Sequence, residues 1–362
     1  MIQIDIRPLW RIRAGEEREF EFQLIELLAE LDATAKLTLA AERAKVSYRH
    51  AWNLIDDWER FFGAKLVTKQ RGRGTVLTLL GKRLLLAGRR AQARLAPELS
   101  NLASEFARSL NATLSESCAA LAVQASHDFA VAQLPAMCAA RGLSLDVQYK
   151  GGFDALAALR RGECDLAGFH VPVGALGALM ARRYAECLPL DRYRLVSFVT
   201  RTQGMIVRPG NPKAITGVHD LCRADVRMVN RQRGSGTRAL LEFMISAAGL
   251  DRSCMRGYES EEITHAAVAA MIAGHQADAG LGVQPAATQY HLDFVPLCAE
   301  RYFLACRADD LDSPPVVQLL EELRGPRLRE LVAALPGYSA PDAGAVLAAL
   351  EPGESPAEAP AR

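Results

Sequence analysis

A stretch in the second half of the chain carries the residue types that bind an anion. Val226–Leu241 reads V-R-M-V-N-R-Q-R-G-S-G-T-R-A-L-L, which predicts a short strand, a turn bent at two glycines and the start of a helix. The first N–H groups of a helix have no partner within it and lie at the positive end of its dipole, so they attract anions. Hydroxyl and guanidinium groups add donors, and no carboxylate competes. We predict an anion site; the alternative is a basic, exposed turn without a ligand.

This turn is not a nucleotide-triphosphate loop, and we expect only one of its arginines to be a ligand. A Walker loop needs G-x-x-x-x-G-K-[ST], and the stretch has no such lysine. A dianion is best held by neutral donors, helix ends and about one arginine, because each further buried cation must itself be desolvated. We predict that Arg231 is the ligand, with Arg233 and Arg238 at the rim or in salt bridges.

Further polar residues lie where the strands and helices of the C-terminal part are expected to meet. From Ala119 short strands alternate with helices, which builds a parallel sheet whose ligands collect beyond the carboxyl ends of its strands. The candidate ligand residues are Ser126, His127, Gly152, His170, Arg231, Ser235, Gly236, Thr237, Thr264 and His265. The three histidines with an acid could form a metal site, but none has the i, i+4 spacing of a metal pair. We expect no metal and no cofactor, and no catalytic residues because no base and nucleophile converge.

The order of the strands predicts two lobes joined by two crossings. A long β run at Leu195–Val207 leaves the first set of strands, and runs at Phe294–Leu297 and Tyr302–Cys306 return to it. A helix at Phe129–Ala140 is expected to follow the first strand. This plan is that of a two-lobed periplasmic-binding-protein-like domain, which closes on its ligand by hinge motion.

The N-terminal part has a local excess of positive charge. The chain as a whole is balanced, with 43 Lys and Arg against 42 Asp and Glu, but Arg43–Arg94 holds thirteen basic and three acidic residues. Such an excess predicts a polyanionic partner.

Three helices and a pair of strands predict a winged helix-turn-helix over residues 1–80. The helices are expected at Phe20–Leu31, Leu37–Ala44 and Tyr48–Phe62, with Ser47 as the N-cap of the third and Gly63 as its end. On the third helix we expect a core face of Trp52, Ile55, Trp58 and Phe62. The Gly-rich tip between the strands places Lys69, Arg71 and Arg73 to meet phosphates. Protein contact is the alternative role for such a domain.

A linker helix is expected over residues 81–112. Leu95, Leu99, Leu102 and Phe106 recur at steps of four, three and four, which is the pattern of a helix that pairs two protomers. Packing of this stripe against its own domain is the alternative. Pro97 should kink the helix or begin a new one.

Cysteine usage and hydropathy indicate a cytoplasmic protein. Eight cysteines lie apart without a C-x-x-C pair, which favours buried free thiols over a disulfide framework or a zinc site. The N-terminus has no apolar run of a signal peptide, and no stretch reaches the length of a membrane span. The Pro- and Glu-rich end is expected to be disordered, and we assign residues 346–362 to this tail.

The N-terminal part resembles a known family of DNA-binding domains. S-Y-R-H-A-W-N-L-I-D-D-W, a basic G-x-G tip and T-V-L-T-L-L-G-K-R-L resemble the winged helix of ModE-type molybdate regulators and, more distantly, of LysR-type regulators. The resemblance covers about residues 20–90. It implies that the start of the third helix enters the major groove of double-stranded DNA, where Ser47, Tyr48, Arg49, His50 and Asn53 would contact bases or phosphates.

The C-terminal part resembles the PBP-like domain of molybdopterin-biosynthesis fusion proteins and of certain regulators. The motifs are N-R-Q-R-G-S-G-T-R, G-Y-E-S-E-E-I-T-H-A-A-V-A-A, A-D-A-G-L-G-V, L-D-F-V-P-L and E-R-Y-F-L. The resemblance implies an oxyanion ligand of the molybdate or tungstate type, or another ligand of molybdenum enzymes such as formate. The chain departs from that pattern with Lys150-Gly151-Gly152 in place of a serine, and from ModE in having a two-lobed sensor.

These observations predict an α plus α/β chain that regulates transcription. The expected parts are a winged helix at 1–80, a linker at 81–112, a PBP-like sensor at 113–345 and the tail, assembled as a homodimer or homotetramer. The alternatives are a molybdopterin-handling enzyme or an oxyanion carrier without a regulatory role. The first lacks a convergent base and nucleophile, and the second lacks an export signal or a membrane anchor.

Overall fold

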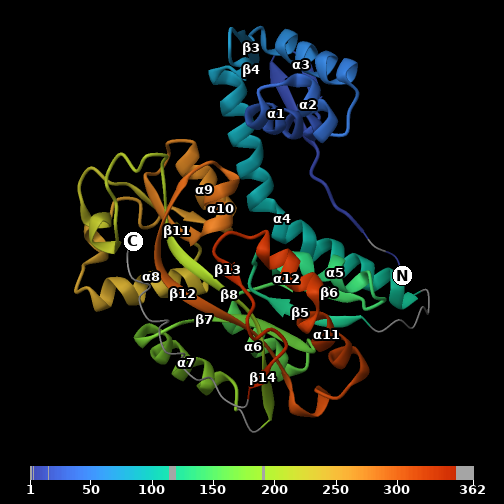
Figure 1. Ribbon diagram of the computed structural model, residues 1–362, viewed down its shortest axis with the longest axis vertical. Helices are drawn as coiled ribbons and strands as arrows, with labels where there is room; N and C mark the ends of the chain where they lie inside the picture. The colour runs from blue at the N-terminus through green and yellow to red at the C-terminus, as the bar shows by residue number, and fades with distance from the viewer. Residues whose placement is uncertain (1, 3, 15, 114–119, 190–191, 348–362) are drawn as a thin grey trace. The chain divides into compact units, whose positions relative to one another are not determined.

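The computed structural model describes the chain except for residues 1, 3, 15, 114–119, 190–191 and 348–362 (Figure 1). Contacts between residues divide it into two compact units, Arg7–Arg94 and the remainder of the chain. Among the described residues no helix is long and apolar enough to cross a membrane.

The Arg7–Arg94 unit consists of helices flanked by two small antiparallel strand pairs. Its elements are β1 Trp10–Ala14, β2 Glu16–Phe20, α1 Phe22–Thr34, α2 Leu37–Arg43, α3 Tyr48–Phe62, β3 Val67–Gln70 and β4 Gly74–Leu77. The β1–β2 pair was not expected, and α1 begins two residues later than predicted because Phe20 ends β2. Leucines of α1 pack against Ile55 and Trp58 of α3 in one apolar core.

Local signals account for the bounds of α3. The Ser47 side chain accepts a hydrogen bond from the backbone N–H of His50 at 3.1 Å, which caps the helix. Gly63 ends it with a φ of 62°, in the left-handed region that glycine adopts at little cost.

The expectation that Trp52 belongs to the core is wrong, because its side chain is 46 % exposed. The buried stripe of α3 is Ala51, Leu54, Ile55 and Trp58. These positions follow the i, i+3, i+4, i+7 pattern of one helix face, and Trp52 lies about 100° away from its first member.

The linker helix α4 spans Leu79–Thr113, and its helical structure continues through Pro97. In its second half the side chain of Asn101 pairs with the backbone of Tyr149, at 3.0 Å to the carbonyl and 2.7 Å from the N–H. Arg108 forms an ion pair with Asp146 at 3.1 Å. Three residues of the predicted stripe lie away from these contacts and are exposed: Leu95, Leu102 and Phe106.

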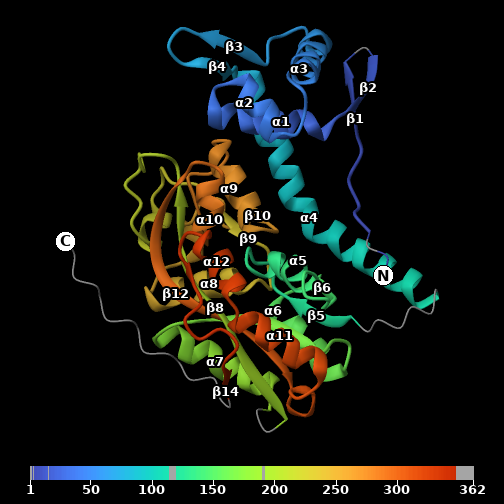
Figure 2. The same cartoon turned by 45° about the vertical axis from the view of Figure 1, so that its right-hand side comes forward.

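The larger unit contains one ten-stranded sheet within the described residues. Its first lobe holds the parallel strands β5 Leu121–Ala125, β6 Leu145–Tyr149 and β7 Leu166–Pro172. Its second lobe holds the parallel strands β9 Met228–Arg231, β10 Glu261–Glu262 and β11 Ala279–Val283. Two antiparallel strands of 15 residues, β8 Tyr193–Val207 and β12 Asp293–Arg307, pass between the lobes (Figure 2).

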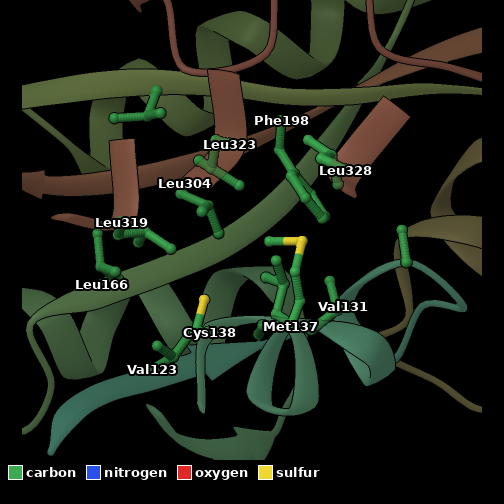
Figure 3. Packing of buried hydrophobic residues seen from close by; sticks show 14 of the residues in the cluster. Val123, Val131, Met137, Cys138, Leu166, Phe198, Leu304, Leu319, Leu323 and Leu328 are labelled. Atoms are coloured by element: carbon green, nitrogen blue, oxygen red, sulfur yellow. The ribbon is translucent and has the colours of Figure 1, made fainter. Parts of the chain in front are cut away.

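Helices cover the sheet in both lobes. They are α5 Leu134–Ala139, α6 Gly152–Arg161, α7 Ala175–Cys187, α8 Gly236–Ala247, α9 His265–Ala273, α10 Gln284–Gln289, α11 Pro314–Arg324 and α12 Pro326–Ala333. Side chains from α5, α11 and α12 close the first lobe's core around Phe198 and Leu304 of the crossing strands (Figure 3).

Three predicted elements differ from the structure. The helix expected at Phe129–Ala140 is a 3₁₀ turn at Val131–Gln133 followed by α5, whose first turn contains Pro135. The two return strands are a single strand, β12, with register irregularities near Pro296 and Tyr302. The short strands β13 Tyr338–Ser339 and β14 Val346–Leu347 pair with β8, so residues 346 and 347 belong to the sheet and not to the tail. The rest of the predicted tail lies outside the described residues.

The expectation of free thiols throughout is wrong for one pair of cysteines. Cys222 and Cys254 form a disulfide across 32 residues of sequence, between two adjacent 3₁₀ turns. The free cysteines of the described residues are Cys138, Cys164, Cys187, Cys298 and Cys306, and Cys118 lies outside them. Sequence spacing could not reveal the pair, because the two turns meet only through the fold of the second lobe.

Candidate functional site

The glycine-bent turn links β9 to α8 as predicted. Gly234 has a φ of 82°, and the Ser235 side chain accepts a hydrogen bond from the Arg238 N–H at 3.1 Å as the N-cap of α8. Thr264 caps α9 in the same way, through a 3.0 Å bond from the Ala267 N–H. Two helix N-termini of the second lobe therefore carry hydroxyl caps.

The first lobe meets this turn at two glycines. A Cβ atom on Gly236 would lie 2.3 Å from His170 Nε2, and a Cβ on Gly151 would lie 3.0 Å from the carbonyl oxygen of Gly234. The end of β7 and the loop before α6 thus approach the start of α8 so closely that only glycine fits at position 236. Gly152, also a predicted ligand, is the buried first residue of α6.

Arg231 is a buried cation with no carboxylate partner among the described residues. Its side chain is 5 % exposed, Nη2 donates to the carbonyl of Ile263 at 2.7 Å and Nε donates to the Gln232 amide oxygen at 3.3 Å. No carboxylate of the described residues lies within ion-pair distance of it. Burial, and then the charge of Arg201, lower the pKa of Arg231 to about 9. A bound anion would offset the cost of burying this charge.

The other two arginines of the turn are engaged with acids of the second lobe. Arg233 is exposed and pairs with Glu259 at 3.0 Å. Arg238 pairs with Glu242 at 3.0 Å and with Glu261 at 3.1 Å, and its guanidinium lies over the ring of Tyr258. Of the three arginines, Arg231 alone has no carboxylate within ion-pair distance among the described residues.

Three buried histidines, His127, His170 and His265, lie near Arg231 and are neutral; we call these four residues the buried centre. Burial lowers the pKa of His127 and of His170 to about 4, and it lowers that of His265 well below its ordinary value. His170 Nδ1 lies 3.3 Å from the Ser126 hydroxyl, which also lies 3.1 Å from the Tyr302 hydroxyl. The atoms His127 Nδ1, His170 Nε2 and His265 Nδ1 have no hydrogen-bond partner in the described part of the chain. Neutral imidazoles can donate to an oxyanion without adding charge.

A fully buried ion network on the crossing strands supports this centre and was missed in the sequence. Arg201 of β8 binds Asp128 at 2.6 Å and Glu300 of β12 at 2.9 Å, and the hydroxyl of Tyr338 donates to Asp128 at 2.7 Å. The second lobe joins the network through Gln203, whose amide donates to the Thr237 hydroxyl at 3.0 Å. The available signal was a pair of long polar side chains, Arg201 and Gln203, on one face of a strand that is mostly buried.

The contacts within this network shift the pKa values of its charged members. Burial alone would raise the pKa values of Asp128 and Glu300. Arg201 and hydrogen bonds outweigh burial at Asp128, and His170, Arg201 and hydrogen bonds outweigh it at Glu300, so both pKa values lie below their ordinary range. Burial by itself would lower the pKa of Arg201, and the two carboxylates instead raise it well above its ordinary value. No group of three potential metal ligands is close enough to hold an ion within the residues that the structure describes.

We expect the protein to lose stability as the pH falls from about 6.5 toward 4. The pKa of His127 is about 4 in the fold because of burial and about 6.5 in an unfolded chain, so the unfolded state binds more protons in this interval. The contribution is complete above pH 6.5 and decreases as the pH falls to the folded value. Melting temperatures between pH 7.5 and 4.5 measure it.

His127→Gln should have a smaller decrease of melting temperature over this interval than the wild type. The exposed His50 provides the control, because His50→Gln leaves the buried centre unchanged. Identical pH profiles for wild type and His127→Gln would contradict the buried, neutral state of His127.

The predicted DNA-contacting residues lie on the surface of the Arg7–Arg94 unit. They are exposed at the start of α3 and around the tip between β3 and β4: Ser47, Tyr48, Arg49, His50, Asn53, Lys69, Arg71 and Arg73. His50 lies 3.0 Å from the amide oxygen of Gln23, and the Ser47 oxygen serves as the helix cap. Arg49, Lys69, Arg71 and Arg73 have no carboxylate within ion-pair distance in the described ranges.

Comparison with known proteins places the larger unit in a family. Residues 136–324 match the model of the PBP superfamily domain, more than half of the chain, and the chain belongs to this family. The uncharacterized protein YvgK of Bacillus subtilis (strain 168) is 37 % identical over 155 residues, which are 43 % of this chain and 50 % of YvgK. An uncharacterized protein in the 5′ region of a 2Fe-2S ferredoxin gene of Clostridium pasteurianum is 30 % identical over 112 residues, 31 % of this chain and 99 % of that protein. The chain therefore spans half the length of YvgK.

Solved structures give weaker likenesses. A hydrogen-peroxide-bound cysteine-to-serine mutant of Corynebacterium glutamicum OxyR has a TM-score of 0.43 at 12 % identity, with 87 % of this chain and 95 % of that chain covered. The tungstate ABC transporter of Geobacter sulfurreducens has a TM-score of 0.44 at 15 % identity, with 59 % of this chain and 97 % of that chain covered.

Proposed function

We propose that this protein is a DNA-binding transcriptional regulator whose PBP-like domain senses a small anion. The observation that carries the sensing role is Arg231, a buried guanidinium beside three neutral histidines. It has no carboxylate partner in the part of the chain that the structure describes. The centre joins two lobes through strands β8 and β12, so an anion held from both sides would favour the closed arrangement. A ligand shifts such an equilibrium only by its preference for one state.

The anion could be any of several chemical types that the sequence resemblance suggests. Molybdate, tungstate and formate are the examples that this resemblance implies, and Arg231 with helix N-termini would attract each of them. The melting temperature of the full chain with molybdate, tungstate, sulfate, phosphate or formate tests the sensing role. Stabilisation by at least one anion is expected, because a ligand that binds only the folded state raises its stability. No stabilisation by any of them would contradict the role.

The proposed DNA-binding role rests on the Arg7–Arg94 unit. Two helices joined by a short turn and followed by an antiparallel strand pair are the elements of a winged helix-turn-helix. The start of α3 and the tip of the strand pair present arginines free of acidic partners in the described residues. A DNA-binding role requires the protein to act in the compartment that contains the DNA. We propose no enzymatic activity.

We expect the double substitution Arg49→Ala and Arg71→Ala to weaken DNA binding. Removing two phosphate or base contacts should lower the affinity for a mixed-sequence duplex roughly 10- to 100-fold and reduce its salt dependence by about two ion contacts. Fluorescence anisotropy titrations at several salt concentrations measure both. Arg60→Ala is the control, since Arg60 already pairs with Asp56 at 3.2 Å. Unchanged affinity in the double variant would refute the assigned DNA surface.

We propose that α4 pairs two protomers through its exposed stripe. Leu102 and Phe106 are 46 % and 55 % exposed, although the opposite face of the helix packs on β6. Leu102→Glu with Phe106→Glu should raise the dimer dissociation constant by at least about 100-fold, because each apolar side chain contributes about 1.5–3 kcal/mol when buried. Analytical ultracentrifugation measures it, with the exposed Ser100→Glu as control. A double variant that remains dimeric would exclude this interface.

A further inference from the structure

Two acceptor oxygens lie unpartnered in the centre that Arg231 joins. Gln203 Oε1 and Glu300 Oε1 are inaccessible to solvent and have no hydrogen-bond partner in the described part of the chain. Both side chains are fully buried on the crossing strands. An unsatisfied buried acceptor costs free energy comparable to a lost hydrogen bond, so a hydrogen-bond donor at either oxygen would be stabilising.

The contacts around these oxygens place them between the two lobes. Glu300 Oε1 lies 3.8 Å from His170 Nε2, the atom that approaches Gly236 at the start of α8. Gln203 reaches the next residue of α8, because its amide nitrogen donates to the Thr237 hydroxyl. The two acceptors therefore lie at the junction of β8 and β12 with the N-terminus of α8.

The neighbours of Gln203 determine the orientation of its side-chain amide group. The Gln203 amide nitrogen donates to the Thr237 hydroxyl, and the Gln203 side chain lies beside the Glu300 carboxylate and lowers its pKa. An ionised carboxylate accepts and cannot donate, so the amide N–H group must face Glu300 and the amide oxygen must face away from it. Rotating the amide by 180° would set two acceptors against each other.

The formal charges of the buried groups around Arg231 sum to zero before any ligand binds. Arg201 and Arg231 are cations, Asp128 and Glu300 are carboxylates, and the three histidines are neutral. A fully deprotonated anion such as sulfate, molybdate or tungstate would bring only negatively charged acceptor oxygens to Glu300. Like charges and facing lone pairs both oppose this arrangement.

We propose that the ligand is an anion that also carries at least one O–H donor, in the way that hydrogen phosphate or a hydroxy acid does. Its negative group binds Arg231 and the helix ends, and its O–H group donates to Glu300 or Gln203. This inference rests on the proposed anion-sensing function and narrows its ligand class. It disfavours the fully deprotonated tetraoxo anions that the sequence resemblance suggests.

Matched pairs of anions test the proposal on the full-length protein. Phosphate and arsenate are compared with sulfate and molybdate, and glycolate is compared with acetate, by isothermal titration and by melting temperature. In at least one pair the member that carries an O–H group should bind at least ten-fold more tightly, and in none should the order be reversed. Equal binding of phosphate and sulfate or molybdate, together with equal binding of glycolate and acetate, would overturn the proposal and leave the anion-sensing function intact. Binding by none of the anions would overturn both.

A substitution of Glu300 tests whether this residue causes the preference for anions that carry an O–H group. Glu300→Gln removes the negative charge and offers an N–H donor, so the ratio of phosphate to sulfate affinity should fall at least ten-fold. The surface substitution Glu242→Gln should leave the ratio unchanged, because Glu242 pairs with Arg238 in the second lobe. An unchanged ratio in a folded Glu300→Gln protein would overturn the role of Glu300. If that variant does not fold, the wild-type comparison alone decides the ligand class.

Discussion

Arg231→Met is expected to abolish most of the anion affinity without destabilising the unliganded protein. Truncating one partner of a buried charge pair costs about 2–5 kcal/mol, which is roughly 30-fold to several thousand-fold in Kd. The unliganded protein should melt at the same or a higher temperature, because an apolar side chain replaces a buried cation that has no carboxylate partner among the described residues. Isothermal titration with the tightest-binding anion and thermal unfolding without it measure the two effects.

The opposite signs of these two effects separate a binding role from a structural one. Arg233→Met is the matched control, since Arg233 is 77 % exposed and paired with Glu259; it should change neither quantity. An Arg231→Met protein that binds the anion as tightly as wild type would show that the site has been assigned wrongly. A large loss of stability without ligand would indicate that Arg231 is structural.

Arg201→Met should be among the most destabilising single changes in the larger unit. It leaves two fully buried carboxylates, Asp128 and Glu300, without their cation. Breaking a buried ion pair in this way costs about 3–5 kcal/mol, which corresponds to roughly 6–20 °C in melting temperature for a domain of this size. Arg161→Met is the control, because Arg161 forms an exposed pair with Glu163. Thermal unfolding near neutral pH measures the difference.

The deficit of Arg201→Met should shrink as the pH is lowered. In the wild type the pKa values of Asp128 and Glu300 lie below their ordinary range, so their stabilising contribution is present above pH 4 to 5 and is lost as the pH falls through the folded values. Without Arg201, burial is opposed less strongly, so both carboxyls should bind protons at higher pH. A deficit that stays constant from pH 7.5 to pH 4.5 would contradict the network as the cause.

Local patterns were sufficient to predict most of the elements in this chain. Apolar spacing, the Ser47 cap and the Gly63 end predict α3 with its observed bounds. The glycine turn after β9 and the first residues of α8 also follow from sequence, because capping and left-handed turns depend on residues close in the chain. Trp52 was misplaced because two overlapping stripes of α3 are apolar, and only packing against α1 decides which one is buried.

Recognising the residues of the candidate site required both the sequence and the tertiary structure. Residue types and the order of strands and helices were enough to nominate Arg231 and the three histidines, because loops at strand ends carry their own sequence signals. The buried ion network could be recognised only from the fold, because it joins residues up to 210 positions apart in the sequence. Its members are Asp128, Arg201, Gln203, Glu300 and Tyr338. The tertiary structure decided that Arg231 has no carboxylate partner among the described residues, while Arg233 and Arg238 have theirs. Partners brought together by the fold leave no periodic trace in a sequence. The sequence by itself therefore predicted the turn at which we propose that an anion binds. The tertiary structure decided which side chains there are charged and which buried acceptor oxygens have no donor among the described residues, because those contacts join residues far apart in the chain.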